Sequence, residues 1–277
     1  MAPLETVFFW TAVVLFALST VLSLYGTLFK KAGAIDASFY ISLLAFGVLN
    51  LAIFFRLEAT GNLPVAGPYE SSLGGVWFIM VFYVGASLKF KSLRITGIAL
   101  FPLSLLLLGY GVMSNPLLAP MTAALRSIWL YIHVLFAWLA FGAFSICLGL
   151  GVLYLLKDKA PQRELLRKIP EPERIEELAF KYLIFGFVTD AVMIASGAMW
   201  AKNLWGHYWN WDPVETWSLI TWLIYGLIIH LRLTMGWKGR RFAWLLILAF
   251  PGMVITYFGI DLLVKSSLHI FEAWQEI

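Results

Sequence analysis

Four histidines and one dense aromatic segment carry most of the reactive chemistry in this sequence. The segment NLWGHYWNWDPVETW, from Asn203 to Trp217, places four tryptophans, one histidine and two carboxylates in fifteen residues. Tryptophan faces suit flat ligands such as carbohydrate, quinone and porphyrin rings, and imidazoles bind metals. A polar connection between two helices needs none of this aromatic mass. The segment therefore predicts a binding site for a flat, partly apolar ligand.

The elements that must position these residues are transmembrane helices. Of the 277 residues, 61% are hydrophobic and only 13% are charged, against about 25% charged in soluble domains. The mean hydropathy is +0.83. We expect an all-α, polytopic integral membrane protein with a single membrane domain over 1–277. Apolar runs predict about eight spans, near 6–29, 37–57, 72–89, 95–113, 127–156, 179–200, 216–235 and 242–264.

The ends of the chain and its single cysteine refine this expectation. The first apolar run contains Glu5 and continues to Phe29, so we interpret it as a retained span rather than a signal peptide. Cys147 is the one cysteine and lies in an apolar stretch, where a small buried side chain is expected. An internal disulfide or CxxC pair is excluded, so thiol chemistry must come from another protein.

The basic residues predict the orientation in the membrane. Sixteen of the 20 Lys and Arg fall on one side, seven of them in the segment 157–181, which we expect to be a solvated cytoplasmic loop. The positive-inside rule places this side in the cytoplasm. Both termini and the tryptophan loop, about 200–217, then face outside. The net charge of +4 follows from this bias and implies no nucleic-acid partner.

Depth separates the four histidines. His133 lies near the outer end of the fifth span, His207 lies in the tryptophan loop, and His269 follows the eighth span on the outer side. His230 lies thirteen residues beyond Trp217, roughly 20 Å into the membrane and in its cytoplasmic half. An ionisable residue within a span indicates function. The alternative for His133 and His230 is a neutral histidine hydrogen-bonded to a neighbouring helix.

A porphyrin is the flat ligand that best fits the outer side. It needs aromatic surfaces, cationic or amide donors for its propionates, and one or two imidazoles for its metal. The outer side offers all three, in Trp200, Trp205, Trp209, Trp211 and Trp217, in Arg126, Lys202 and Asn203, and in His133 and His269. An interfacial aromatic belt is the simpler alternative, but a belt does not explain the spacing W-x3-W-x-W-D-P-x-E-x-W.

The two carboxylates of the loop fit a helix start. Asp212 at the N-cap, Pro213 at the first helical position and Glu215 at the third resemble a capping box for the seventh span. This structural role is compatible with shaping a haem platform.

The segment from Ser196 to Arg241, with SGAMWAKNLWGHYWNWDPVETW at its start, closely resembles the WWD domain of the CcsA (ResC) family of haem-handling proteins. The resemblance extends to IWLYIHVLFAWLAFGAFS in the fifth span, GPYESSL before the third, and DLLVKSSLHIF near the end. It therefore covers nearly the whole chain. Members act in cytochrome c biogenesis by system II, in a bacterial cytoplasmic membrane or a thylakoid membrane.

The resemblance implies a role for each matched residue. His133 and His269 would ligate haem iron at the outer site, and His230 would ligate haem within the membrane together with a histidine of a CcsB (ResB)-like subunit. The tryptophan loop with Asp212 would hold haem b. Haem would be joined there to the CXXCH thiols of apocytochrome c, kept reduced by other proteins. As a haem lyase component, the chain would act only with its partner. His207 matches no family histidine.

Other classes remain open on the sequence. A haem-delivery module of the CcmC type would share the tryptophan loop without performing ligation. An electron-transfer subunit with b-type haem would place paired histidines on facing helices within the bilayer. A transporter for another ligand would bind no metal.

Overall fold

The protein is a bundle of long helices. The computed structural model describes residues 1–277 except 66, 115–124, 160–168 and 261–277. Its elements are α1 (Pro3–Leu28), α2 (Ala32–Thr60), α3 (Pro68–Lys89), η1 (Lys91–Thr96), α4 (Gly97–Met113), α5 (Ile128–Lys159), α7 (Pro172–Trp205), α8 (Pro213–Thr234), α9 (Arg240–Val254) and η3 (Ile255–Gly259). Within these described residues, eight helical segments are long and apolar enough to cross a membrane, when η1 joins α4 and η3 joins α9. The predicted all-α membrane fold with eight spans is confirmed.

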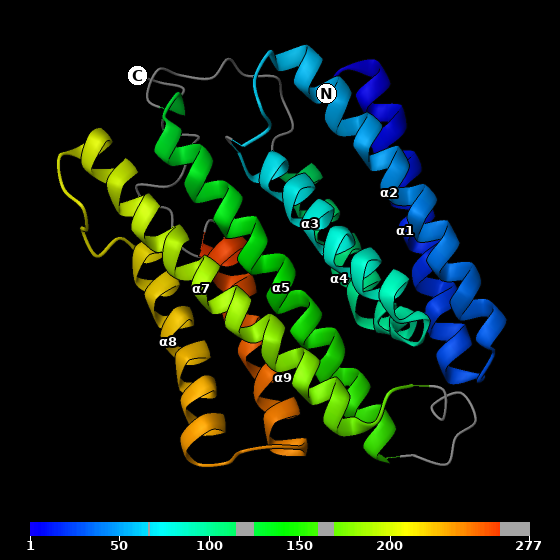
Figure 1. The fold of residues 1–277 in the computed structure, drawn as a ribbon. Helices are drawn as coiled ribbons and strands as arrows, with labels where there is room; N and C mark the ends of the chain where they lie inside the picture. The colour runs from blue at the N-terminus through cyan, green and yellow to red at the C-terminus, as the bar shows by residue number, and fades with distance from the viewer. Residues whose placement is uncertain (66, 115–124, 160–168, 261–277) are drawn as a thin grey trace.

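Helix α5 lies at the centre of the bundle. It packs against α7, α9, α3 and α4, while α1 and α2 form a hairpin along one side (Figure 1). The helices alternate in direction. The connections at 61–67 and 206–212 therefore lie at one end, which we call the aromatic end and which is uppermost in Figure 1. The connections at 29–31 and 235–239 lie at the opposite, basic end.

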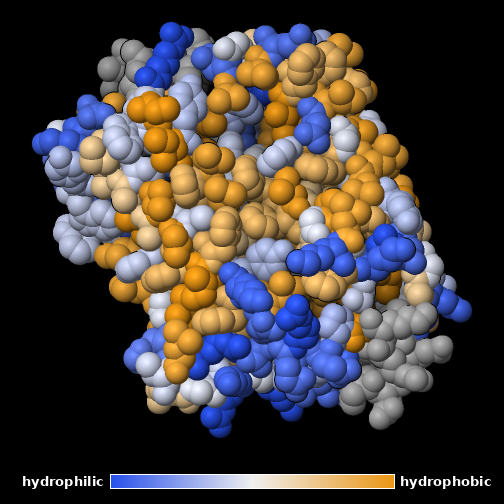
Figure 2. Space-filling model, viewed as in Figure 1, coloured by the Kyte–Doolittle hydropathy of each residue, from blue (hydrophilic) through white to orange (hydrophobic). Residues whose placement is uncertain are grey.

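Apolar side chains cover the outside of the bundle as well as its core. Figure 2 shows them across the middle of one face, with hydrophilic residues gathered mainly toward the ends. Exposed side chains on α1 such as Val7, Val14 and Val21 are 57–62% accessible. Lipid tails solvate such apolar surfaces at no cost in free energy, whereas exposing them to water would be unfavourable. The molecule is a multi-pass membrane protein.

The segment 157–181 differs from the solvated loop that the sequence predicts. Helix α5 continues to Lys159 and α7 already begins at Pro172, so both helices extend past the apolar runs. Glu177 pairs with Arg174 at 2.7 Å and with Lys181 at 2.8 Å, one helical turn away on either side. Such pairs stabilise a helix in water, which explains how α7 continues beyond its apolar run. The sequence EPERIEEL forms the first turns of α7, with Glu171 at the N-cap and Glu173 in the first turn.

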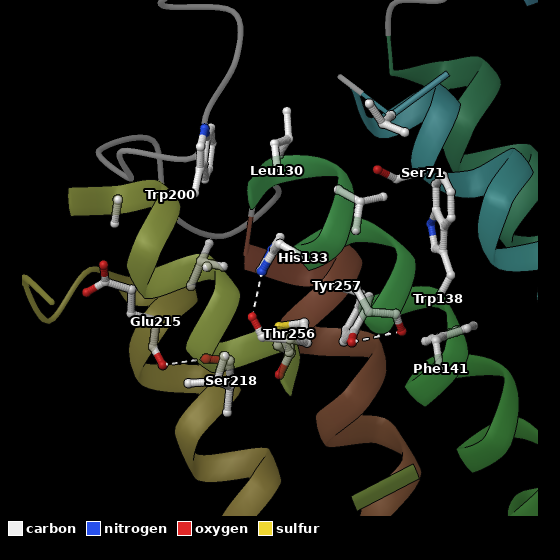
Figure 3. A pocket seen from close by; sticks show the side chains of 18 of the residues that line it. Ser71, Leu130, His133, Trp138, Phe141, Trp200, Glu215, Ser218, Thr256 and Tyr257 are labelled. Carbon is white, nitrogen blue, oxygen red and sulfur yellow. Dashed lines mark hydrogen bonds between the residues drawn. The ribbon is translucent and has the colours of Figure 1, made fainter. Parts of the chain in front are cut away.

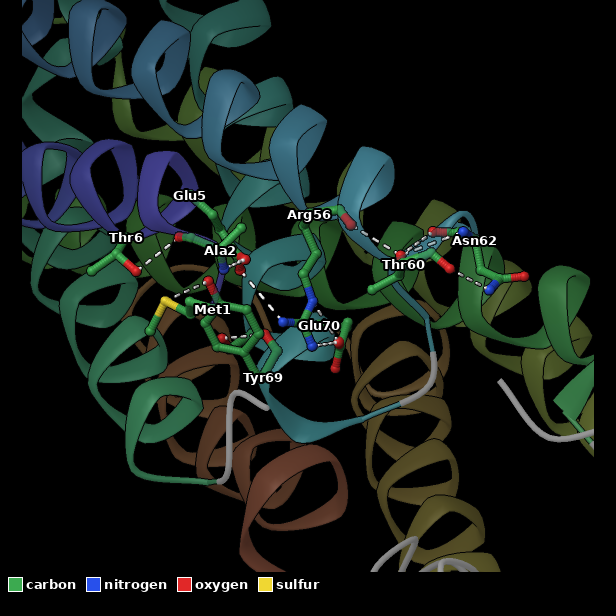
Figure 4. Close-up of polar contacts among 10 residues, drawn as sticks. Met1, Ala2, Glu5, Thr6, Arg56, Thr60, Asn62, Tyr69 and Glu70 are labelled. Carbon is green, nitrogen blue, oxygen red and sulfur yellow. Dashed lines mark hydrogen bonds and ion pairs between the residues drawn. The ribbon is translucent and has the colours of Figure 1, made fainter. Parts of the chain in front are cut away.

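A buried ion cluster ties α1, α2 and α3 together at the aromatic end. Arg56 of α2 is 2% exposed and donates from Nε to Glu70 Oε1 of α3 at 2.9 Å (Figure 4). Its guanidinium also lies 3.6 Å from Glu5 of α1, which is fully buried, and 5.0 Å from the Tyr69 ring centre. These contacts fix the start of α3 and the preceding connection, from which Val65 and neighbouring residues line the cleft described below.

We expect Arg56→Ala to destabilise the protein by about 3–5 kcal/mol, because removing the cation leaves the buried carboxylate of Glu5 and the partly buried carboxylate of Glu70 without their counter-charge. Unfolding of the purified protein in detergent measures this loss. Arg126→Ala is the matched control, since Arg126 is exposed at the same end. Equal stability of the two variants would contradict a structural role for the cluster.

Candidate functional site

A cleft opens at the aromatic end between α3, α5, α7, α8 and η3. The space between its walls, with the open mouth included, is about 1230 Å³. Aromatic and aliphatic side chains form most of its walls, together with a few polar ones (Figure 3). The polar members are His133, Ser71, Glu215, Ser218 and Thr256. A large apolar space with few convergent polar groups is typical of a cofactor or ligand site.

The His133 imidazole is held against the backbone of α7. His133 lies in the second turn of α5, and its Nδ1 lies 2.8 Å from the carbonyl oxygen of Met193. A carbonyl accepts only, so Nδ1 carries the proton and donates. In a neutral imidazole the lone pair that binds metals is then on Nε2. A hydrogen bond of this kind orients histidine ligands in metal sites.

Gly197 makes this close approach of the ring possible. A Cβ at Gly197 would lie 2.7 Å from His133 Nδ1, closer than a Cβ atom approaches another atom to which it is not bonded. Met193 O is the acceptor one helical turn before Gly197, so the ring rests on the bare backbone of α7. The small residue at 197 therefore forms a socket for the imidazole. Sequence reasoning missed Gly197, because a glycine in a membrane helix carries no pattern that marks it.

Two tryptophans of the predicted set line the cleft beside His133. Trp200 is 2% exposed and lies 6.5 Å from the His133 ring, with 25° between the ring planes. Trp209 lines the cleft from the connection between α7 and α8. Trp205 packs behind Trp200, 5.5 Å between ring centres. Both rings line the cleft, and their contact with a flat ligand stays a prediction.

The remaining tryptophans lie outside the cleft lining. Trp211 is 70% exposed and meets Trp209 edge-on, with ring centres 5.8 Å apart. Trp217 lies on α8, and its carbonyl accepts a 3.2 Å hydrogen bond from Thr256. The five predicted tryptophans therefore form no single platform. Lys202, predicted as a propionate donor, donates to the carbonyl of Gly206 at 2.6 Å and lies over the Tyr208 ring.

The start of α8 confirms the predicted capping box. The side chain of Asp212 accepts from the amide of Val214 at 3.0 Å, and Glu215 accepts from the amide of Asp212 at 3.2 Å. Pro213 occupies the first helical position. Helix α7 ends with Gly206 at φ 83°, a left-handed conformation that favours glycine. These two helix ends fix the length and exit angles of the tryptophan loop.

The floor of the cleft comes from a π-helical turn that the sequence did not predict. Thr256 of η3 contacts the hydroxyl of Thr221 at 2.8 Å and the carbonyl of Gly252 at 2.9 Å. The next residue, Tyr257, lines the cleft and donates to the carbonyl of Ala137 at 3.1 Å. Extra residues in a helical turn redirect side chains and occur often at functional sites.

The carboxyl group of Asp190, in the middle of α7, is buried, and this residue is 1% exposed.

His207 and His230 do not line this cleft. His207 is exposed in the tryptophan loop. His230 is exposed on the outer side of α8, one turn from the end of that helix, so it does not pack between helices of this chain. His269 and Asp261 lie outside the described residues. Within the part that the structure describes, no group of three or more His, Cys, Asp and Glu could hold a metal ion. Cys147 is buried, as predicted.

Comparisons with known proteins agree with this architecture. The sequence model of the cytochrome C assembly protein family matches residues 7–268. The cytochrome c biogenesis protein CcsA of Guillardia theta is 32% identical over 274 residues, covering 89% of this chain and 89% of that protein. CcsA of Prochlorococcus marinus (strain MIT 9312) is 32% identical over 269 residues, covering 86% of this chain and 85% of the relative.

A solved structure shares the fold. The cytochrome c haem lyase CcmF superposes with a TM-score of 0.67 at 19% sequence identity, covering 99% of this chain and 48% of CcmF. The chain thus spans about half the length of CcmF. Because the family match covers most of the sequence and the CcsA relatives align over most of their own length, this chain belongs to the cytochrome c assembly protein family.

Proposed function

We propose that this chain carries haem to the outer face of the membrane and presents it in the cleft for attachment to apocytochrome c. Membership of the family assigns the chain a role in cytochrome c maturation. The observation that carries the finer proposal is the socket of His133. It combines an imidazole of fixed tautomer with two aromatic walls in one large apolar cleft. Haem, taken here as haem b, is the substrate that needs all three features.

His133 and His269 are the proposed axial ligands of the iron. The chain reaches the aromatic end of the bundle at Ile260, and eight residues lie between Ile260 and His269. A fully extended chain of that length spans about 30 Å, which is enough to reach the cleft from Ile260. In this proposal Trp200 and Trp209 contact the porphyrin. Trp205, Trp211 and Trp217 support the loop, and Asp212 caps the helix that carries it.

The attachment step adds a thiol across a vinyl group of haem. The sulfur of the apocytochrome cysteine bonds to the vinyl carbon next to the ring, and the thiol proton ends on the terminal carbon. Each addition conserves atoms and electrons, so no oxidant is consumed. The chain's part is to hold haem with its vinyl edge toward the incoming CXXCH segment and to exclude competing reactions. The lyase activity of this chain, as proposed, requires the thiols to be delivered reduced.

The proposed inner site rests on the position of His230. An ionisable side chain facing lipid is costly, and His230 is exposed on the same side of α8 as Leu223 and Leu227. A CcsB-like subunit that covers this face would bury the imidazole and supply the second iron ligand. The basic end would then face the cytoplasm, where haem enters, and the aromatic end would face the periplasm or the thylakoid lumen. Haem would move from His230 to His133.

The alternative functions differ in how well they fit the structure. An electron-transfer subunit would need facing histidines between its own helices, whereas His230 is directed away from the described bundle. A haem-delivery module fits the cleft equally well and differs in its product. Formation of thioether bonds by the purified complex separates ligation from delivery.

We expect His133→Gly to abolish cytochrome c maturation, because the cleft loses its proposed iron ligand. Added imidazole should restore part of the activity by entering the space that the side chain vacates. The measurement is covalent haem in a co-expressed reporter cytochrome. His207→Ala is the matched control and should be milder, since His207 is exposed in the loop. Normal maturation in the glycine variant would contradict the assignment of His133 as an iron ligand.

Variants of the two histidines should differ if haem moves from an inner to an outer site. In the complex purified with its CcsB-like partner, His230→Ala should lower the haem content of both sites, because supply fails first. His133→Ala should retain haem at the inner site. Haem content and absorption spectra of the two complexes measure the difference. Equal loss in both variants would refute the ordered path and favour one shared site.

A further inference from the structure

We propose that Glu215 is a positioning residue that holds Trp211 in a left-handed backbone conformation and thereby sets the aromatic wall of the cleft. The part of this inference that concerns haem rests on the proposed function above. The part that concerns the loop rests on the structure alone.

Trp211 has an unusual backbone for a large aromatic residue. Its φ is 57°, in the left-handed region that favours glycine, asparagine and aspartate. Such a conformation is strained for tryptophan and persists only when surrounding contacts impose it. The indole is 70% exposed, so side-chain burial does not impose it. The backbone contacts on either side of Trp211 must therefore do so.

Glu215 supplies those contacts from the first turn of α8. One carboxylate oxygen, Oε2, accepts from the amide of Asn210 at 2.8 Å and from the amide of Asp212 at 3.2 Å. These two amides flank Trp211 and converge on one oxygen because Trp211 is left-handed. Backbone N–H groups around a left-handed residue can form a concave site for an anion. Glu215 is 9% exposed and lies at a helix N-terminus, where a carboxylate is favoured.

This arrangement goes beyond helix capping. A capping box requires only the bond from Glu215 to the amide of Asp212, and Asp212 caps the helix by accepting from Val214. The additional bond to Asn210 reaches back into the loop and serves no helix end. Asp212 therefore caps the helix, whereas Glu215 also shapes the loop.

The conformation of Trp211 is transmitted to the cleft through Trp209. The two rings meet edge-on at 88°, with centres 5.8 Å apart, and Trp209 lines the cleft together with Glu215. The hydroxyl of Thr216 adds a 3.3 Å bond to the carbonyl of Trp211. Releasing the amides of Asn210 and Asp212 would let Trp211 relax to negative φ, and Trp209 would lose its support.

Residue-resolved amide exchange and haem titration together test this inference. The full chain is purified with its CcsB-like partner as wild type, Glu215→Ala and Glu215→Gln. Glu173→Ala is the matched control, because Glu173 is an exposed acidic residue in the first turn of α7. In Glu215→Ala, exchange at the Asn210 and Asp212 amides should rise roughly ten- to hundredfold, as expected for lost hydrogen bonds to a charged group.

Affinity for haem should fall in the same alanine variant by roughly two- to tenfold, the range of one aromatic contact. Glu215→Gln keeps an acceptor oxygen and should restore both readouts toward wild type. Unchanged exchange in Glu215→Ala would overturn the inference. Raised exchange with wild-type haem affinity would also overturn it, because the loop would then not shape the site.

Failure of the proposed function gives a different result. The wild-type complex could bind no haem while amide exchange still rises in Glu215→Ala. That result would contradict haem binding in the cleft and would support the role of Glu215 in holding the backbone conformation of Trp211. If Glu215→Ala does not fold, Glu215→Asp replaces it. The shorter side chain cannot reach both amides, so exchange at Asn210 should rise; wild-type exchange there would overturn the inference.

Discussion

The contact of the His133 imidazole with the α7 backbone is the constraint on which the geometry of the cleft depends. It requires two helices to approach closely enough for a side chain of one to reach a main-chain carbonyl of the other, at 2.8 Å. Only a residue without a Cβ at 197 permits this. The same contact selects the tautomer of the ring. This one contact therefore determines the packing of α5 against α7, the orientation of the His133 ring and the nitrogen that is free to bind a metal.

The rest of the aromatic end holds the walls around that imidazole. The buried Arg56 cluster fixes the start of α3. The left-handed Gly206 and the capping box at Asp212 fix the tryptophan loop. Threonine hydroxyls fix the π-helical turn below. Each of these contacts supplies a hydrogen-bond or ion-pair partner to a backbone or charged group in a region where a membrane offers no water. The cleft can thus stay open and apolar while its rim remains rigid.

The sequence predicts the features that depend on local pattern. The eight spans follow from apolar runs, and the capping box follows from the spacing of Asp212, Pro213 and Glu215. The apolar run at 179–200 is shorter than α7, because hydropathy marks the membrane and does not mark where a helix ends in water. The Gly197 socket and the conformation of Trp211 depend on contacts between elements or on backbone angles, which no local pattern records. The outward direction of His230 depends on helix rotation, so depth alone could not give it.

The most direct test of the account is the effect of Gly197→Ala on the iron ligand field. The added Cβ should displace the His133 ring without removing it, and the absorption and electron paramagnetic resonance spectra of haem in the purified complex should lose the signature of the His133 ligand. Gly85→Ala, where no atom lies within 4 Å of the new Cβ, should leave the spectra unchanged. Wild-type spectra in Gly197→Ala would show that His133 in its socket does not ligate haem, and would contradict the account.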